Sequence, residues 1–237
     1  MLLFYQPNIR SISRENTNFL NEEDSRHCIK VLRKNSKDII HVVDGKGGLY
    51  ECEISKPNDK KCEFTILSEQ HDFQKSDIYL HIAIAPTKNA DRIEWFIEKC
   101  VEIGIDEISL IQTIHSERKN QKVERLEKIA ISAMKQSLKA YLPKINELID
   151  FDSFLKIMEQ SKVKQKLIAH LTDDAQPLVK IIEPNTSYCL LIGPEGDFSE
   201  NEVIKAQKSG FQVVMLGKSR LRTETAGVVA CTIINLI

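Results

Sequence analysis

The sequence contains little that indicates a membrane or secreted protein. No apolar run in the 237 residues approaches the ~20 residues that a helix needs to cross a bilayer. Residues 1–7 do not combine a basic segment with a long apolar one, as a secretory signal does. We therefore expect a cytoplasmic protein with no membrane partner.

The chain also lacks the spacings of a disulfide framework or a metal centre. Its six cysteines form no Cys-x-x-Cys pair, and its six histidines show no metal-ligand spacing. In a chain without a secretory signal, such cysteines are expected to be free and mostly buried thiols. We predict no metal site. The cysteines are Cys28, Cys52, Cys62, Cys100, Cys189 and Cys231.

Three common catalytic motifs are missing. There is no Gly-x-x-x-x-Gly-Lys-[Ser/Thr] loop, which cradles nucleoside triphosphates. There is no Gly-x-Gly-x-x-Gly after a strand, and its absence disfavours a Rossmann-type oxidoreductase. The Gly-x-Ser-x-Gly turn of many hydrolases is absent too.

Basic residues are present in local clusters, although the net charge is only −1. Residues 25–37 hold five Lys or Arg and no acid, and residues 116–144 hold eight against three Glu. Residues 217–222 add Lys218, Arg220 and Arg222. Each cluster alone is compatible with a solvated helix face. Three clusters on a nearly neutral chain favour a phosphate-bearing partner.

The pattern of apolar residues divides the chain into two parts. Residues 1–72 show short strand-like runs separated by turns, which favours a small β-barrel or sheet domain. Residues 73–237 alternate strands with helices, which predicts an α/β domain with a parallel sheet. We place the boundary in the polar stretch 71–77. The expected helices are 22–32, 91–103, 123–142, 151–160, 199 onward and 223–237, and the expected strands are 39–43, 49–54, 62–67, 78–85, 105–111, 145–149, 166–171, 188–192 and 211–216.

The last fifty residues contain two strand–loop–helix units in tandem. The first loop comprises residues 193–197 (Gly-Pro-Glu-Gly-Asp), and the second loop comprises residues 217–222. Ser199 and Glu202 fit a capping box, and Thr223 is the expected N-cap of the final helix. Because ligands of open α/β sheets bind at the carboxyl ends of neighbouring parallel strands, we expect the two loops to hold a nucleotide-like cofactor.

The same residues carry a family resemblance. The segments 192–196, 216–217 and 221–226 resemble the ribosomal RNA small subunit methyltransferase E family, of the SPOUT class of knotted methyltransferases. Residues 91–95 with Lys99 and Glu102-x-Gly104 are similar to that family's first helix, and His27 with residues 31–33 is similar to its PUA-like domain. The resemblance covers nearly the whole chain.

The resemblance implies an enzyme that transfers a methyl group from S-adenosylmethionine to N3 of a uridine in 16S rRNA. It implies a PUA-like RNA-binding β-barrel over 1–72 and a SPOUT domain over 73–237 whose C-terminal segment forms a deep trefoil knot. The partners would be 16S rRNA or the small ribosomal subunit and a second copy of the chain. Two alternatives stay open: methylation at another RNA position, either a ribose 2′-oxygen or another base, and a non-catalytic RNA-binding assembly factor.

The resemblance also implies roles for individual residues. Arg222 would offset the charge that develops on the uracil, and Glu195 would orient the cofactor or satisfy amides of the first loop. RNA contacts are expected at His27, Arg33, Arg92, Lys139 and Arg220. The expected cofactor-binding residues are Leu191, Gly193, Pro194, Glu195, Gly196, Leu216, Gly217, Leu221, Arg222, Thr223 and Ala226.

Two departures from the family pattern bear on these roles. Asp197 stands where the family commonly has a second glycine, which makes the first loop less permissive there. Leu138-Lys139-Ala140 replaces a frequent Gly-Arg-Asn, so Lys139 offers a point charge in place of a bidentate guanidinium. Core packing remains an alternative role for Leu191, Leu216 and Leu221. For His27 and Arg33 the alternative is simple surface exposure without an RNA contact.

Overall fold

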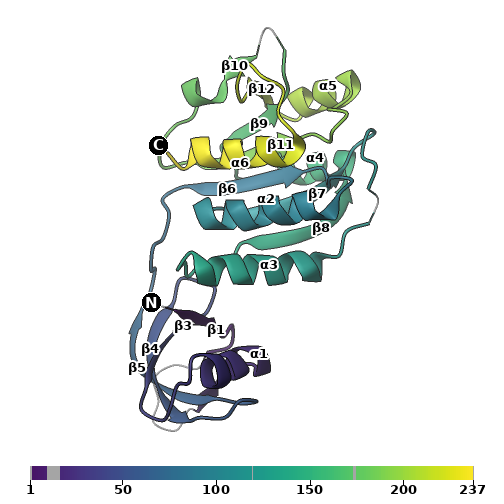
Figure 1. The fold of residues 1–237 in the computed structure, drawn as a ribbon. Helices are drawn as coiled ribbons and strands as arrows, with labels where there is room; N and C mark the ends of the chain where they lie inside the picture. Colours follow the sequence, from purple (N-terminus) through teal and green to yellow (C-terminus); the bar gives the residue numbers. More distant parts are fainter. Residues whose placement is uncertain (1, 10–16, 119, 173–174, 237) are drawn as a thin grey trace. The chain divides into compact units, whose positions relative to one another are not determined.

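A computed structural model describes residues 2–9, 17–118, 120–172 and 175–236. By its internal contacts the chain forms two compact units (Figure 1). Unit 1 combines Met1–Lys75 with Ile131–Leu142, and unit 2 combines Ser76–Ala130 with Pro143–Ile237. Unit 1 thus includes Ile131–Leu142, which we expected to belong to the second domain. The domain boundary after residue 72 stays a prediction.

Unit 1 is built on a five-stranded sheet. β1 runs parallel to β3, and the other pairs are antiparallel. The turn between β3 and β4 contains Gly45 and Gly47 at φ 77° and 97°, a backbone conformation that favours glycine. In sheet order the strands are β1 (Leu3–Tyr5), β3 (Ile39–Val43), β4 (Leu49–Lys56), β5 (Glu63–Gln70) and β2 (Asn18–Phe19).

The helix expected over 22–32 is present, but its second half differs from an α-helix. α1 (Glu22–Arg26) begins at Asn21, whose side chain accepts a hydrogen bond from the Asp24 backbone N–H at 2.8 Å. It continues as η1 (His27–Val31), a π-helical turn, which the apolar periodicity did not reveal. Cys28 on this turn is fully buried in the core of unit 1 with Phe4, Leu20 and Phe64.

The segment 131–142 joins unit 1 through specific contacts. α3 (Val123–Gln136) ends six residues before Leu142, the end that we expected. Leu138 follows at φ 58°, outside the helical region, so the helix ends there and does not extend to Pro143. Lys135 Nζ lies 2.8 Å from Asp24 Oδ1, which ties the end of α3 to α1.

Unit 2 is a seven-stranded sheet in which every pair of neighbours is parallel, as the alternating pattern predicted. β9 lies between β11 and β12. The expectation that the strands before the two loops are neighbours is therefore wrong. In sheet order the strands are β10 (Gln176–Pro177), β12 (Gln212–Met215), β9 (Gln165–Ala169), β11 (Ser187–Ile192), β6 (Tyr79–Ile84), β7 (Glu107–Gln112) and β8 (Lys144–Asp150).

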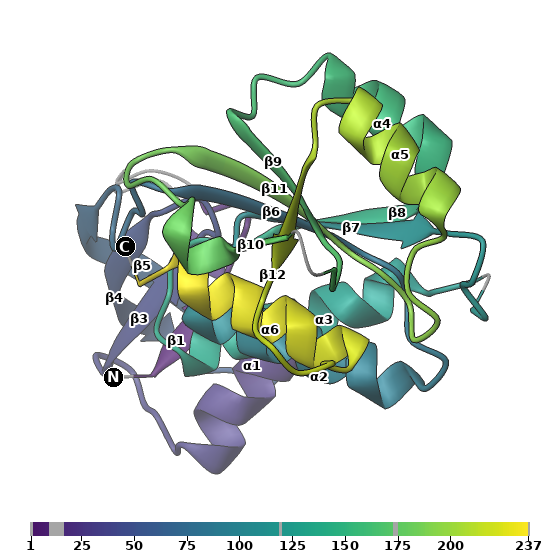
Figure 2. The same ribbon diagram turned by 90° about the horizontal axis from the view of Figure 1, so that it is seen from above.

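Helices cover both faces of this sheet. α2 (Ala90–Ile103) and α6 (Thr223–Ile234) lie on one face of the sheet (Figure 2). α4 (Phe151–Glu159) and α5 (Glu200–Lys208) lie on the other face. η2 (Leu178–Lys180) is a short 3₁₀ turn. α2 ends at Gly104, as predicted, with φ 137°. α2 and α6 approach so closely that a Cβ built at Gly227 would collide with the ring of Phe96.

α6 is less buried than its apolar sequence indicated. Its buried positions follow one stripe, which includes Gly227, Ala230, Cys231 and Ile234. Val228, Val229 and Ile233 are only half-buried, and Ile237 lies outside the described residues. A second apolar face of α6 thus remains partly open in this chain.

A buried polar network crosses the amino ends of β6, β7 and β8. His81 Nε2 and Asn146 Nδ2 each lie 2.8 Å from Ser109 Oγ, and Asn146 Nδ2 also donates to Glu107 Oε1 at 2.6 Å. Tyr79 donates its hydroxyl to the same Glu107 carboxylate. Burial lowers the pKa of His81 to about 4. Partial burial alone would raise the pKa of Glu107, but these hydrogen bonds and the nearby His81 and Lys144 outweigh it and lower that pKa to about 2.

Two features of the described residues bear on earlier expectations. All six cysteines belong to the described part of the chain, and each is a free, buried thiol, as predicted. Within that same part, no helix is long and apolar enough to cross a membrane.

Candidate functional site

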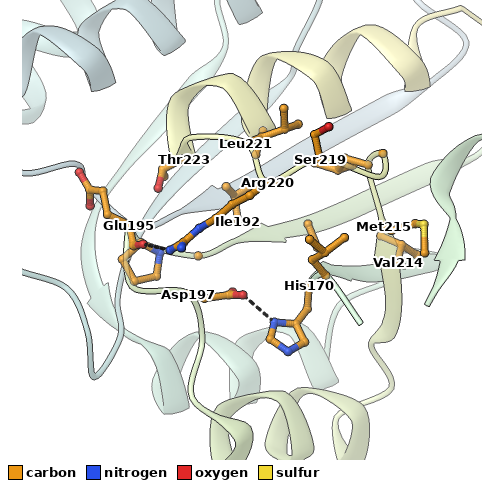
Figure 3. A pocket seen from close by; sticks show the side chains of 17 residues that line it. His170, Ile192, Glu195, Asp197, Val214, Met215, Ser219, Arg220, Leu221 and Thr223 are labelled. Carbon is orange, nitrogen blue, oxygen red and sulfur yellow. Dashed lines mark hydrogen bonds and ion pairs between the residues drawn. The ribbon is translucent and has the colours of Figure 1, made fainter. Parts of the chain in front are cut away.

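A cavity opens at the carboxyl ends of β9, β11 and β12, where both loops begin (Figure 3). It contains about 610 Å³ of space between protein atoms, part of it open to solvent. Because β9 lies between the other two strands, its last residue Ala169 and the following residue His170 also line the cavity.

Most of the residues that we expected to bind a cofactor line this cavity. Those that do are Gly193, Pro194, Glu195, Leu216, Gly217, Leu221, Thr223 and Ala226. Three expected residues lie elsewhere: Leu191, Gly196 and Arg222. The cavity also includes residues that the sequence did not single out, among them His170, Ile192, Asp197, Met215 and Ser219.

The strand β11 contributes Ile192 to the cavity and not Leu191. Leu191 is fully buried in the core between the sheet and helices α4 and α5, with Phe154, Ile168 and Phe198. Successive side chains of a strand point to opposite faces of the sheet. We therefore replace Leu191 with Ile192 as the apolar wall on this strand.

Asp197 shapes the end of the first loop. It has φ 63°, a left-handed conformation in which Asp is better tolerated than most residues. Its Oδ1 accepts a hydrogen bond from the Phe198 N–H at 2.7 Å, and its Oδ2 lies 3.0 Å from His170 Nδ1. His115 Nδ1 lies 3.0 Å from the Asp197 carbonyl oxygen. The residue that departs from the family pattern thus lies against two histidines, which follow β9 and β7.

Glu195 and Arg220 connect the two loops. Arg220 Nη2 donates to the Glu195 carbonyl oxygen at 2.9 Å, as the dashed line in Figure 3 shows. Glu195 Oε1 accepts from the backbone N–H of Lys88 at 3.2 Å, in the turn that follows β6. The Glu195 carboxylate therefore satisfies an amide, though of the turn after β6 and not of its own loop. Arg220, which we expected to bind RNA, lines the cofactor cavity.

The second loop passes directly into α6. The N-cap is Arg222, at φ −71° and ψ 156°, and Thr223 is the first helical residue, so the expectation that Thr223 is the cap is wrong. Thr223 is 3% exposed and lines the cavity. Its Oγ1 has no hydrogen-bond partner among the residues that the structure describes. A buried hydroxyl in this state is a place where a ligand can donate or accept a hydrogen bond.

Gly217 contributes through its missing side chain and not through its backbone conformation. It does not have a positive φ, so its turn does not require glycine. A Cβ built there meets no described protein atom within 4 Å. Because Gly217 lines the cavity, a side chain would occupy space in the cavity. The missing side chain therefore leaves room for a ligand.

A second hollow lies beside the first turn of α6. It contains about 570 Å³ of space, open to solvent, and is lined by Asp91, Arg92, Trp95, Arg222, Glu224 and Thr225. Arg92 Nε lies 3.7 Å from Glu224 Oε1. Two residues with expected catalytic or RNA-binding roles, Arg222 and Arg92, meet here and not in the cofactor cavity.

The remaining expected RNA contacts belong to unit 1. His27 lies on η1 with its ring edge-on to Phe4, at 6.4 Å between ring centroids. Arg33 is exposed and has φ 55°. Lys139 is half-buried and lies just beyond α3. Arg33 thus presents its charge to solvent directly after the π-helical turn.

Comparisons with known proteins agree with this geometry. Residues 74–235 match the RNA methyltransferase domain family, and residues 20–67 match the RNA methyltransferase PUA domain family. The chain is therefore an RNA methyltransferase with a PUA domain. "Ribosomal RNA small subunit methyltransferase E" of Mesomycoplasma hyopneumoniae is 31% identical over 209 residues, with 86% of this chain and 88% of the relative covered. The chain belongs to the ribosomal RNA small subunit methyltransferase E family.

Two solved structures are similar over nearly the full chain. A probable rRNA methyltransferase from Porphyromonas gingivalis is 40% identical, with a TM-score of 0.89 and coverage of 98% of this chain and 95% of that one. A ribosomal RNA small subunit methyltransferase E from Neisseria gonorrhoeae, bound to S-adenosylmethionine, is 29% identical, with a TM-score of 0.86 and the same coverage.

Proposed function

We propose that this protein binds S-adenosylmethionine between its two loops and methylates N3 of a uridine in 16S rRNA of the small ribosomal subunit. The observation that carries the proposal is the cavity between the loops, in a chain that is 29% identical to a structure bound to S-adenosylmethionine. The uridine N3 position comes from the family resemblance. We place the protein in the cytoplasm, where the small subunit is assembled.

The residues of the cavity fit this cofactor. Ile192, Leu216 and Leu221 offer apolar walls for an adenine ring. The unpartnered Thr223 hydroxyl and the open space beside Gly217 provide one polar contact and one close backbone approach. When bound, S-adenosylmethionine supplies an electrophilic methyl group on a positively charged sulfur.

The chain's own residues would act mainly by position and charge. Arg220 holds the two loops together, and Glu195 anchors the first loop to the turn after β6. Methyl transfer depends on alignment of donor and acceptor, which a rigid cavity supplies. Arg222, in the second hollow, would stabilise negative charge on the oxygens of a uracil ring after its N3 proton leaves.

RNA binding would involve the basic residues of unit 1. Arg26, Lys30, Arg33, Lys34 and Lys37 are all exposed or half-buried. Phosphate contacts of this kind make the affinity for RNA fall as salt rises. A salt-independent affinity would contradict this part of the proposal.

A homodimer is the proposed assembly. The half-buried side chains Val228, Val229 and Ile233 of α6 provide an apolar surface of unit 2 that a second copy can cover. Sedimentation at micromolar concentration should give twice the chain mass. The trefoil knot implied by the resemblance stays a prediction.

The decisive experiment uses small ribosomal subunits from cells that lack this modification. They are incubated with the protein and labelled S-adenosylmethionine, and the rRNA is digested to nucleosides. The expected product is 3-methyluridine in 16S rRNA. A ribose-methylated nucleoside or another methylated base would support the alternative position, and no label with no heat of cofactor binding in calorimetry would support a non-catalytic assembly factor.

A further inference from the structure

Glu224 is a buried carboxylate that the cofactor cavity does not use. The residue is 6% exposed and lies in the first turn of α6. Its Oε1 is 3.7 Å from Arg92 Nε, and its Oε2 has no hydrogen-bond partner in the described parts of the chain. A buried carboxylate oxygen without a donor is costly to the folded protein. Such an atom is therefore a candidate contact for a ligand that carries an N–H or O–H group.

This carboxylate lines the second hollow beside the cofactor cavity. Thr223 and Ala226 line the cofactor cavity, whereas Glu224 and Thr225 line the second hollow. The first turn of α6 therefore has one cavity on each side. A methyl donor in one cavity and an acceptor in the other would therefore lie close to the same helical turn.

The polar groups of the second hollow complement one edge of uracil. That edge presents a carbonyl oxygen, the N3–H donor and a second carbonyl oxygen, an acceptor–donor–acceptor pattern. The residues that line the hollow include one carboxylate, Glu224, and two guanidinium groups, Arg92 and Arg222. Cytosine presents an acceptor at N3 and an amino donor beside it, so it would meet like groups. Trp95 is 41% exposed in the same hollow and offers a ring face for stacking.

We propose that the second hollow binds the target uracil and that Glu224 is the general base that removes its N3 proton. This inference rests on the proposed uridine-N3 methylation. The proton passes from N3 to Glu224 Oε2, and the electron pair of the N–H bond stays on N3. That pair forms the new bond to the methyl carbon, while the carbon–sulfur pair leaves with the sulfur. The proton on Glu224 is then released to solvent.

Three charged residues line the hollow around Glu224. They are Asp91 and Arg92 on α2 and Arg222 at the start of α6. Only a carboxylate can accept the proton, so a neutral amide at position 224 should not act as a base.

The test compares Glu224→Gln, Glu224→Asp and a control, Glu200→Gln. Glu200 is an exposed carboxylate in the first turn of α5, outside both cavities. Single-turnover methylation of undermodified small subunits is measured across pH with saturating cofactor, and cofactor affinity is measured by calorimetry. Glu224→Gln should lower the rate about 100-fold or more, with cofactor affinity unchanged. Glu224→Asp should keep part of the rate, and Glu200→Gln all of it.

Three results would overturn the inference. A Glu224→Gln rate close to wild type removes the general base, while the proposed function stands. Equal losses in Glu224→Gln and Glu224→Asp, together with weaker cofactor binding, indicate a structural carboxylate. Failure of the wild-type protein to form 3-methyluridine removes the proposed function and this inference with it.

Discussion

Arg220 Nη2 donates a hydrogen bond to the carbonyl oxygen of Glu195 at 2.9 Å, so a side chain of the second loop holds the backbone of the first. The two residues are 25 positions apart in the chain. The bond therefore links the geometry of both cofactor loops.

Replacing Arg220 with Ala should weaken cofactor binding. The loss of one hydrogen bond from a charged donor corresponds to about a tenfold weaker affinity. Calorimetric titration with S-adenosylmethionine measures it. Lys218→Ala removes a positive charge from the same loop at an exposed position that does not line the cavity, and should leave the affinity unchanged. Equal effects of both variants would show that charge alone matters, not the contact with Glu195.

Asp197 provides a test of backbone strain in the first loop. Asp197→Gly and Asp197→Ala both remove the carboxylate that contacts Phe198 N and His170. Only glycine adopts φ 63° without steric cost, so Asp197→Ala should be less stable than Asp197→Gly by about 1 kcal/mol. Urea denaturation of the two variants gives this difference. Equal free energies of unfolding would mean that the loop relaxes away from the left-handed conformation.

Replacement by Ala should affect stability at Gly227 and cofactor binding at Gly217. Gly227→Ala forces a Cβ against the ring of Phe96 where α2 and α6 meet, and should destabilise the protein by roughly 1–3 kcal/mol. Gly217→Ala places its Cβ in open space of the cavity, so it should leave stability unchanged and weaken cofactor binding. Thermal unfolding and calorimetry separate the two effects. A destabilised Gly217→Ala variant would contradict the role given to that position.

His81 should make the fold sensitive to mild acid. Burial lowers its pKa from 6.5 to about 4 in the folded state, so between these pH values the unfolded chain binds more protons. The contribution of His81 to the free energy of unfolding is fully present above pH 6.5 and is lost as pH falls toward 4. The total loss is about 3 kcal/mol. Glu107, with a pKa of about 2, extends the loss to lower pH because its contribution requires the ionised form.

The variant His81→Asn isolates this effect. Its free energy of unfolding should change less than that of the wild type between pH 6.5 and 4, whatever its absolute stability. Denaturant unfolding at a series of pH values gives both curves. Parallel curves for the two proteins would exclude His81 as the origin of the slope.

Local signals in the sequence were sufficient for most elements around the site. The capping box of Ser199 and Glu202 is present, with both reciprocal hydrogen bonds. The apolar strands before both loops were predicted within a residue or two of their bounds. These features depend on neighbours in the chain, which periodicity and capping rules describe.

Features that depend on topology were not accessible in this way. β9 lies between β11 and β12, so His170 reaches the cavity, and no local pattern reports such a strand order. The strand 187–192 is apolar on both faces, so its sequence does not show which residue, Leu191 or Ile192, faces the cavity. The unpartnered oxygens of Thr223 and Glu224 appear only once the surrounding atoms are placed.

The most direct test of the central claim is a crystal structure of the protein with S-adenosylmethionine. The account predicts that the adenosyl group lies between residues 193–197 and 216–221, within hydrogen-bond distance of Thr223 Oγ1 and against Gly217. An adenosyl group bound elsewhere, with the cavity at the ends of β9, β11 and β12 unchanged, would contradict it.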